Sequence, residues 1–203
     1  MQRRPFVAVV CVAVASLAIM VQASHQVDGP LDPSDGQRLL DKLVQIAERD
    51  GTQTRAFEPV VIHQREVNAY LRFQAAAEIP ASVTDPDVAL RNGGAVSVQA
   101  IVDLSELRDS RPRGPLDPLR YLGGRVLVAA SGLVRTQNGI GHVIVESVTL
   151  GGVSMPASVL AELVRYYARS EQNPDGIDVT EPFDLPYGVT ELRVERERVV
   201  VVQ

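Results

Sequence analysis

The stretch EPFDLPYGVTELRVERERVVVVQ, at residues 181–203, holds a Pro-Tyr-Gly turn signal, a charged strand and four consecutive valines. The alternation in residues 189–195 predicts a half-buried strand with Leu192 and Val194 on its inner face. After a turn at residues 196–197, the final strand is apolar on both faces. A strand in an ordinary half-buried sheet needs one apolar face, so this pattern predicts that something covers the second face.

A similar two-faced pattern appears earlier, in a predicted β-hairpin. Residues 123–136 and 139–152 flank Gln137-Asn138, and Asn138-Gly139 is the usual sequence of a type I′ turn. Both strands are apolar on much of both faces, whereas an antiparallel sheet commonly has one wet face. We therefore expect these two strands to be covered on both sides.

The other predicted elements complete an α+β pattern of strands and amphipathic helices. They are strands at residues 57–63 and 95–104 and helices at residues 34–51, 64–77 and 154–170. Ser34 or Asp35 is expected to cap the first helix, and Ser154 the last, with Pro156 in its first turn. Residues 35–203 are predicted to form one α+β domain, preceded by a flexible tether at residues 24–34.

The N-terminus has the pattern of an export signal. Arg3 and Arg4 precede an apolar run at residues 6–21, and small residues follow it up to Ala23. The run is short for a membrane-spanning helix, so residues 1–23 are predicted to be a cleaved signal peptide, with an uncleaved membrane anchor as the alternative. We therefore expect the domain to be periplasmic or otherwise extracytoplasmic.

Composition argues against several classes of function. The formal net charge of −5, with no basic cluster, argues against binding to nucleic acid. The chain's one cysteine, Cys11, lies inside the predicted signal, so the mature domain would carry neither disulfides nor a thiol nucleophile. No cofactor is predicted.

No set of residues predicts catalysis or metal binding. The segment GGVSMP at residues 151–156 lies between a strand and a helix, but it lacks the second glycine of a nucleophile elbow. Ser154 is therefore interpreted as a helix cap. His63 and His142 each lack a neighbouring histidine or cysteine at ligand spacing, so no metal site is expected. We expect the protein not to be an enzyme.

Three short motifs resemble small exported bacterial proteins related to the tubular lipid-binding (TULIP) superfamily. Residues 151–156 are similar to their passage from sheet to helix, and LPYGV at residues 185–189 is similar to the "L-P-x-G-I" segment before their last hairpin. Residues 63–71 (HQREVNAYL) resemble their early "E-x-N-x-L" helix. The likeness covers roughly residues 57–73 and 140–203. The final turn departs from it, because the family pattern there is Asp-Gly or Asn-Gly, in place of Arg-Glu.

The resemblance implies a strongly curved antiparallel sheet wrapped around a helix, with an apolar groove between them. Residues expected to line this groove come from the last helix and from valines of the sheet. They are Val159, Leu160, Leu163, Tyr167, Val126, Val128, Val143, Val145, Val200 and Val202. Because side chains alternate along a strand, a register slip of one residue would exchange the whole valine set.

The predicted function is non-catalytic binding of a lipid or another apolar ligand in that groove, with a membrane surface as a further candidate partner. The alternative fold is a closed two-layer α+β sandwich, which would suit an envelope scaffold or assembly subunit without a ligand. An apolar cavity would favour ligand binding, whereas a filled core with an exposed apolar patch would favour the scaffold. The sequence identifies no protein partner.

Overall fold

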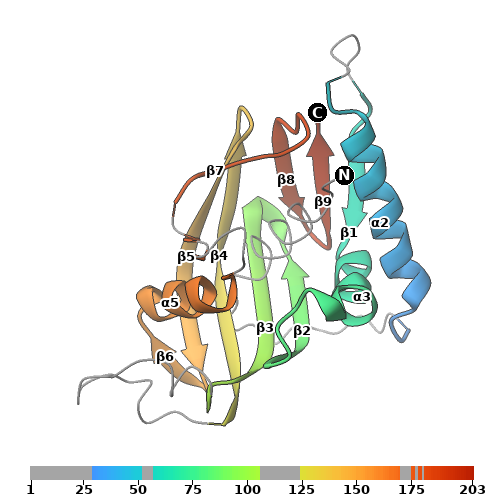
Figure 1. Cartoon of the computed structure of the whole chain (residues 1–203). Helices are drawn as coiled ribbons and strands as arrows, with labels where there is room; N and C mark the ends of the chain where they lie inside the picture. The colour runs from blue at the N-terminus through green and yellow to red at the C-terminus, as the bar shows by residue number, and fades with distance from the viewer. Residues whose placement is uncertain (1–28, 52–56, 106–123, 170–174, 177, 180) are drawn as a thin grey trace.

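The computed structural model has an α+β fold with antiparallel sheets, as the sequence predicts (Figure 1). The described residues are 29–51, 57–105, 124–169, 175–176, 178–179 and 181–203. The elements are α2 (Pro33–Glu48), β1 (Val60–His63), α3 (Gln64–Phe73), η1 (Ala75–Ala77), β2 (Val83–Leu90), η2 (Asn92–Gly94), β3 (Ala95–Asp103), β4 (Arg125–Gln137), β5 (Ile140–Leu150), β6 (Val153–Met155), α5 (Ala157–Tyr167), β7 (Phe183–Asp184), β8 (Glu191–Glu195) and β9 (Arg198–Val202).

The strands form two antiparallel sheets. The smaller sheet has the order β1-β9-β8, and the larger has the order β2-β3-β4-β5-β6, with β7 paired to β5. The hairpin between β4 and β5 turns at Asn138 and Gly139, whose φ angles of 52° and 80° are those that a type I′ turn requires. This confirms the predicted hairpin and its turn.

The N-cap of helix α2 lies two or three residues before the cap that the sequence suggested. Its N-cap is Asp32, which accepts a hydrogen bond from the backbone N–H of Ser34, and Asp35 completes a capping box. The prediction that Ser34 or Asp35 is the cap was therefore wrong. Hydrogen bonds from Ser34, through its side chain and then its backbone, lower the pKa of Asp32 below its ordinary value.

Helices α2 and α3 cross closely because a glycine lies between them. Gly36 is buried inside α2, and a Cβ placed there would lie 2.9 Å from the backbone nitrogen of Tyr70 in α3. Only a residue without a side chain allows this approach. The contact brings Leu39, Leu43 and Ile46 of α2 into the core.

Strand β9 explains the four valines at the end of the chain. Val199 pairs with Ile62 and Val201 with Val60, and all four side chains face the core shared with α2, α3 and the larger sheet. Val200 and Val202 point to the opposite face, where their neighbours on β8 are Arg193 and Glu191. Both valines are half-buried there.

The expectation that β4 and β5 are covered on both sides was wrong. One face of these strands is buried, with Val148 and Leu150 almost inaccessible to solvent. On the other face, Leu127 and Ile144 keep 48% and 46% of their surface exposed. The apolar residues on this outer face therefore lie in contact with water.

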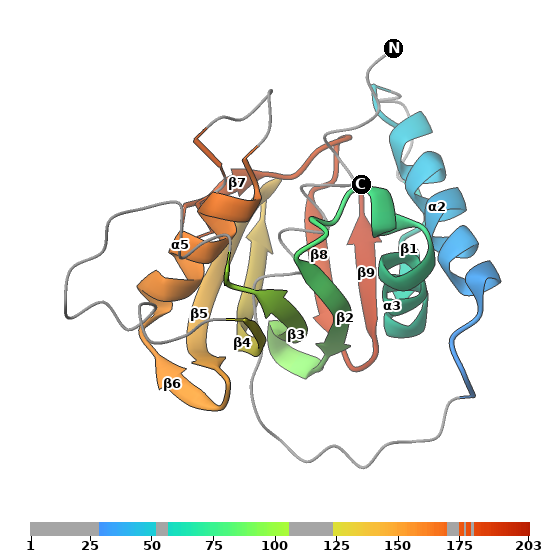
Figure 2. The ribbon, with the colours of Figure 1, turned by 60° about the horizontal axis from the view of Figure 1, so that its bottom comes forward.

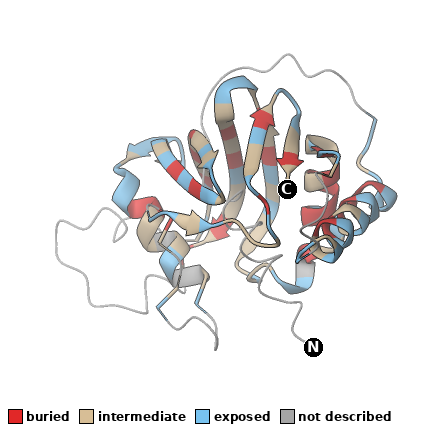
Figure 3. Ribbon diagram, turned by 90° about the horizontal axis from the view of Figure 1, so that it is seen from above, coloured by how far each residue is buried: buried red, intermediate tan, exposed pale blue. Residues whose placement is uncertain are grey.

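Two core clusters lie on the same face of the larger sheet, toward opposite ends of its strands. Figure 2 shows α5 beside the larger sheet, with α2 and α3 on the other side of the molecule, and Figure 3 marks the buried positions in red. The first is covered by α2, α3 and the smaller sheet. The second is covered by α5 and contains Val102, Leu104, Val128, Ala130, Val148, Leu150, Val159 and Leu160. Val145 of β5 contacts both clusters.

Strand β2 was not predicted, because Pro80, Pro86 and the Asn92-Gly93-Gly94 turn are typical of turns and loops. The strand tolerates Pro86 since it lies at the edge of the sheet and at a β-bulge, where Asp85 and Pro86 together oppose Ala100. Asp85 adopts a φ of 50°, which accommodates the extra residue of the bulge.

The β8–β9 turn lacks the glycine or asparagine typical of a tight hairpin, and hydrogen bonds from neighbouring segments stabilise it. Glu197 has a φ of 61°, while its N–H donates to the carbonyl of Leu90 and its carbonyl accepts from the N–H of Gln64. The N–H of Arg196 donates to Asn92 Oδ1 at 2.9 Å. Tertiary hydrogen bonds thus maintain a backbone conformation that the local sequence disfavours.

Replacing Glu197 with glycine should raise the free energy of unfolding by about 0.5–1 kcal/mol, because the left-handed conformation strains a side chain there. Urea unfolding followed by circular dichroism measures the change. Arg196→Gly is the control and should destabilise slightly, since Arg196 has an ordinary negative φ. A loss of stability in Glu197→Gly would show that the turn carries no strain.

Candidate functional site

The structure brings together half of the residues predicted to line an apolar groove. Val126, Val128, Val145, Val159 and Leu160 all belong to the cluster beneath α5. Val128, Val159 and Leu160 are buried there, and the other two are half-buried. The sheet and the last helix therefore meet through the residues that the sequence indicated.

The remaining predicted residues lie elsewhere. Val143 belongs to the other cluster, beneath the smaller sheet, and Val200 and Val202 are on the outer face of that sheet. Leu163 and Tyr167 lie in the helical part of α5, but their side chains are outside the described residues. The two predicted valines of β9 therefore point away from the core, and Val199 and Val201 face it instead.

The face of the larger sheet beneath α5 is aliphatic. The buried polar side chains found in the described part of the chain are Asp35, Glu66 and Asn68, and all three lie on α2 or α3. Beneath α5, the buried side chains are valine, leucine and alanine. Such a surface offers dispersion contacts without hydrogen-bond partners, which suits hydrocarbon.

Both ends of α5 have identifiable supports. A turn at Gly151 and Gly152, both with positive φ and open space around them, connects β5 to β6 and leads into the helix. Near the other end, Arg165 forms an ion pair with Asp178. The helix is therefore attached to the sheet through a glycine turn at one end and an exposed ion pair at the other.

Ser154 has a different role from the one predicted. It lies on β6, exposed and paired with Thr149, while Pro156 occupies the N-cap position of α5. The interpretation of Ser154 as the helix cap was therefore wrong. The chain adds a short strand before the helix because the Gly151-Gly152 turn returns it to pair with β5.

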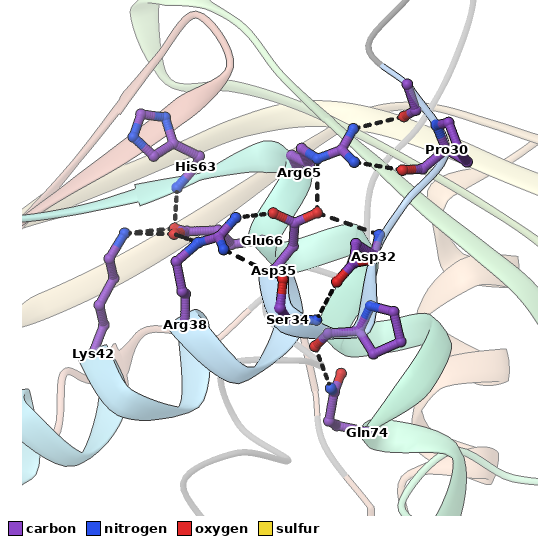
Figure 4. Close-up of polar contacts among 12 residues, drawn as sticks. Pro30, Asp32, Ser34, Asp35, Arg38, Lys42, His63, Arg65, Glu66 and Gln74 are labelled. Carbon is purple, nitrogen blue, oxygen red and sulfur yellow. Dashed lines mark hydrogen bonds and ion pairs between the residues drawn. The ribbon is translucent and has the colours of Figure 1, made fainter.

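The motif that resembles the "E-x-N-x-L" helix consists here of Glu66, Asn68 and Leu71, with one extra residue before the leucine. Its glutamate forms a polar connection between the two N-terminal helices (Figure 4). Glu66 accepts hydrogen bonds from Lys42 Nζ of α2, at 2.6 and 2.7 Å, and from the backbone N–H of His63 at 2.8 Å. Arg38 Nε lies 3.6 Å from the same carboxylate. Glu66 is 4% exposed, so its charge is compensated inside the protein.

A second buried carboxylate holds the segment that precedes α2. Asp35 forms ion pairs with Arg38 and, at 2.7 Å, with Arg65 Nε. The guanidinium of Arg65 also donates to the carbonyls of Gly29 and Pro30, at 2.7 and 2.5 Å. Residues 29–32, which the sequence assigned to a flexible tether, are therefore bound to α3 (Figure 4).

The asparagine of the motif completes the edge of the larger sheet. Asn68 Nδ2 donates to the carbonyl of Val88 at 2.9 Å, and Asn68 Oδ1 accepts from the N–H of Val88 at 2.8 Å. Gln64 Oε1 accepts from the N–H of Leu90 at 2.6 Å. Two amide side chains of α3 thus form the backbone hydrogen bonds that a neighbouring strand would otherwise form at the edge of β2.

Sequence reasoning found the motif but not these contacts. One available signal was the D-x-x-D spacing of residues 32–35, which is typical of a capping box and marks Asp35 as the N3 position. Nothing in the sequence indicated that Asn68 or Gln64 would bind strand β2, because β2 was itself unrecognised.

The histidines and acidic side chains described here do not assemble a metal site. Among the residues that the structure describes, no three histidine, cysteine, aspartate or glutamate side chains lie together as metal ligands would. His63 and His142 have exposed side chains in different sheets. No described helix is long and apolar enough to cross a membrane.

No protein-family model, no curated protein and no solved structure matches this chain.

Proposed function

We propose that this chain is an exported, non-catalytic protein that binds a lipid or another apolar ligand between the larger sheet and helix α5. One observation carries this proposal: the buried side chains described on the sheet face beneath α5 are aliphatic, and this short helix lies over them (Figure 2). The export pattern of residues 1–23 supports a location outside the cytoplasm.

Binding requires α5 to move, because the cluster beneath it is closed. Val159 and Leu160 are 8% and 4% exposed. An acyl chain that takes their place against the sheet would gain about 0.8 kcal/mol for each buried methylene. The Gly151-Gly152 turn provides a pivot near one end of the helix, since both residues have open space around them.

The finer prediction concerns the fold. The TULIP resemblance implies a sheet that curves strongly around a helix and leaves a permanent groove. The strong curvature remains a prediction. It would provide the groove for the ligand once α5 moves away from the strands. A structure of the protein with a bound lipid would test it directly.

Native mass spectrometry tests the proposed function. We expect the chain from residue 24 onward, purified from a bacterial periplasm without detergent, to carry mass in the lipid range or to acquire it from phosphatidylglycerol vesicles. Val164→Asp, which places a carboxylate at the half-buried edge of the cluster, should abolish that mass.

The matched control is Ser158→Asp, which adds the same charge to an exposed position of α5. It should retain the lipid. If Val164→Asp loses its cooperative thermal transition, Val126→Thr introduces a hydroxyl on the sheet side with nearly unchanged shape and should weaken lipid uptake. A parent chain that stays bare after incubation with vesicles would contradict the proposal.

A specific observation favours a second candidate, the envelope scaffold. The cluster beneath α5 is filled, while Leu127 and Ile144 are exposed on the outer face of the sheet. If the scaffold interpretation holds, Leu127→Glu should leave folding intact and abolish an assembly detected by chemical crosslinking in the periplasm. The same variant should not alter lipid uptake.

A further inference from the structure

A cleft of about 500 Å³ lies between the C-terminal end of α3 and the bulge of β2. Its volume falls in the range of small-molecule sites. Its apolar lining consists of Leu31, Leu71, Ile79, Pro80, Ala81, Val83 and Pro86. The polar lining consists of Arg72, Thr84, Asp85, Asp87 and Gln99.

One wall of the cleft depends on the segment before α2. Leu31 is held in place because Arg65 binds the carbonyls of Gly29 and Pro30, and Gln74 Nε2 donates to the carbonyl of Pro33 at 2.9 Å. The wall is therefore part of the folded domain.

The acidic side chains of the cleft lie on one strand. Asp85 and Asp87 are on the β2 side, whereas Arg72, in the last turn of α3, lines the opposite side, so a cation would bind on the β2 side. Asp87 accepts a hydrogen bond from Asn68 Nδ2 at 3.2 Å, which fixes its position. Asp85 makes no hydrogen bond or ion pair within the described part of the chain, so its carboxylate is available to a ligand.

The bulge is what places Asp85 at the cleft. Its φ of 50° is uncommon for a residue with a side chain, and it coincides with the extra residue of β2. Glycine or asparagine would fit that conformation with less strain. An aspartate there gives up backbone stability while presenting a carboxylate beside an apolar surface.

We propose that this cleft binds a small amphipathic amine, whose ammonium group contacts Asp85 and Asp87 and whose alkyl chain lies on Leu71, Ile79 and Val83. The two carboxylates supply acceptors for the ammonium, and the apolar side chains supply the contact for the alkyl part. Val83 also packs against the cluster under α5, but Asp85 and Asp87 do not belong to that cluster, so the ammonium site differs from the apolar site proposed there.

Three probes of equal chain length test the charge preference: octylammonium, octan-1-ol and octanoate. Each is titrated into the chain from residue 24 onward below its micellar concentration, and backbone amide shifts are followed by NMR. We expect octylammonium to perturb the amides of the cleft and to bind at least fivefold more tightly than octanoate. Equal affinities, or no saturable binding of octylammonium, would overturn the proposal.

Variants identify the carboxylate responsible. Asp85→Asn suits the positive φ, so the fold should persist, and it should weaken octylammonium binding at least fivefold while leaving octan-1-ol unchanged. Asp50→Asn removes an exposed carboxylate just beyond α2 and is the matched control, expected to bind like the parent. Unchanged octylammonium affinity in Asp85→Asn would show that the amine binds elsewhere. Asp85→Asn should not affect lipid uptake under α5. The two experiments therefore distinguish a failure of this proposal from a failure of the proposed function.

Discussion

Replacing Glu66 with alanine should lower the free energy of unfolding by about 2–4 kcal/mol. The substitution removes the buried carboxylate that binds Lys42 Nζ at 2.6 Å and leaves the N–H of His63 without its acceptor. Loss of one partner from a buried pair is costly because the remaining charge has been taken out of water. The side chain of Lys42 is 25% exposed, so water recovers part of that cost. Urea denaturation followed by circular dichroism gives the difference.

Two further variants separate the charge from the helix cap. Glu66→Gln keeps an oxygen that can accept from the N–H of His63, so its expected loss is about 1–2 kcal/mol. Glu48→Ala, on the exposed side of α2, is the control and should change stability by less than about 0.5 kcal/mol. If Glu66→Ala loses less than about 1 kcal/mol, the network contributes no more than a surface ion pair.

Replacing Asn68 with alanine should cost about 2–4 kcal/mol. Both backbone groups of Val88 lose their partners, and Val88 is fully buried. Each buried group left without a hydrogen bond costs about 1–3 kcal/mol. Urea unfolding measures the global change. Amide hydrogen exchange should show an additional loss of protection at Val88.

Exchanging the amide and the carboxylate between positions 68 and 87 makes this prediction specific to hydrogen bonding. Asn68→Asp keeps the acceptor for the N–H of Val88, but it cannot donate to the carbonyl of Val88 and it faces the carboxylate of Asp87. We expect it to be as destabilising as Asn68→Ala. Adding Asp87→Asn should recover at least a third of the loss, because an amide can donate to the new carboxylate. Gln45→Ala, at an exposed position of α2, is the control. Protection of Val88 that matches the parent in Asn68→Ala would rule out this role for the asparagine.

Glu66 and Asn68 show how much of a residue's role can be predicted from a local sequence motif. The spacing of Glu66, Asn68 and Leu71 predicted a helix, and α3 confirms it. The pattern also suggested a family likeness, but the function of each side chain depends on its partners. Lys42 lies 24 residues before Glu66, and Val88 lies 20 residues after Asn68. Contacts at such separations are not encoded in a local pattern.

The missed strand has a similar explanation. Proline and aspartate in residues 83–90 are turn formers by local propensity, and β2 exists because α3 supplies hydrogen bonds to its outer edge. The expectation that β4 and β5 are covered on both faces failed for a related reason. Apolar alternation reports what a strand could bury, whereas the position of α5 and the smaller sheet decides which face is buried.

Local sequence determined the elements that depend on neighbouring residues. The period of apolar residues is sufficient for α2, α3, α5 and most strands, and Asn138-Gly139 is sufficient for the β4–β5 turn. Only the tertiary structure decided the face of each strand that is buried and the conformation of the Arg196-Glu197 turn. The physical reason is that side-chain alternation is symmetric between two faces. The choice between Val199 with Val201 and Val200 with Val202 is made by the hydrogen-bonded register of β9 with β1, and by the helices that cover one side of that sheet.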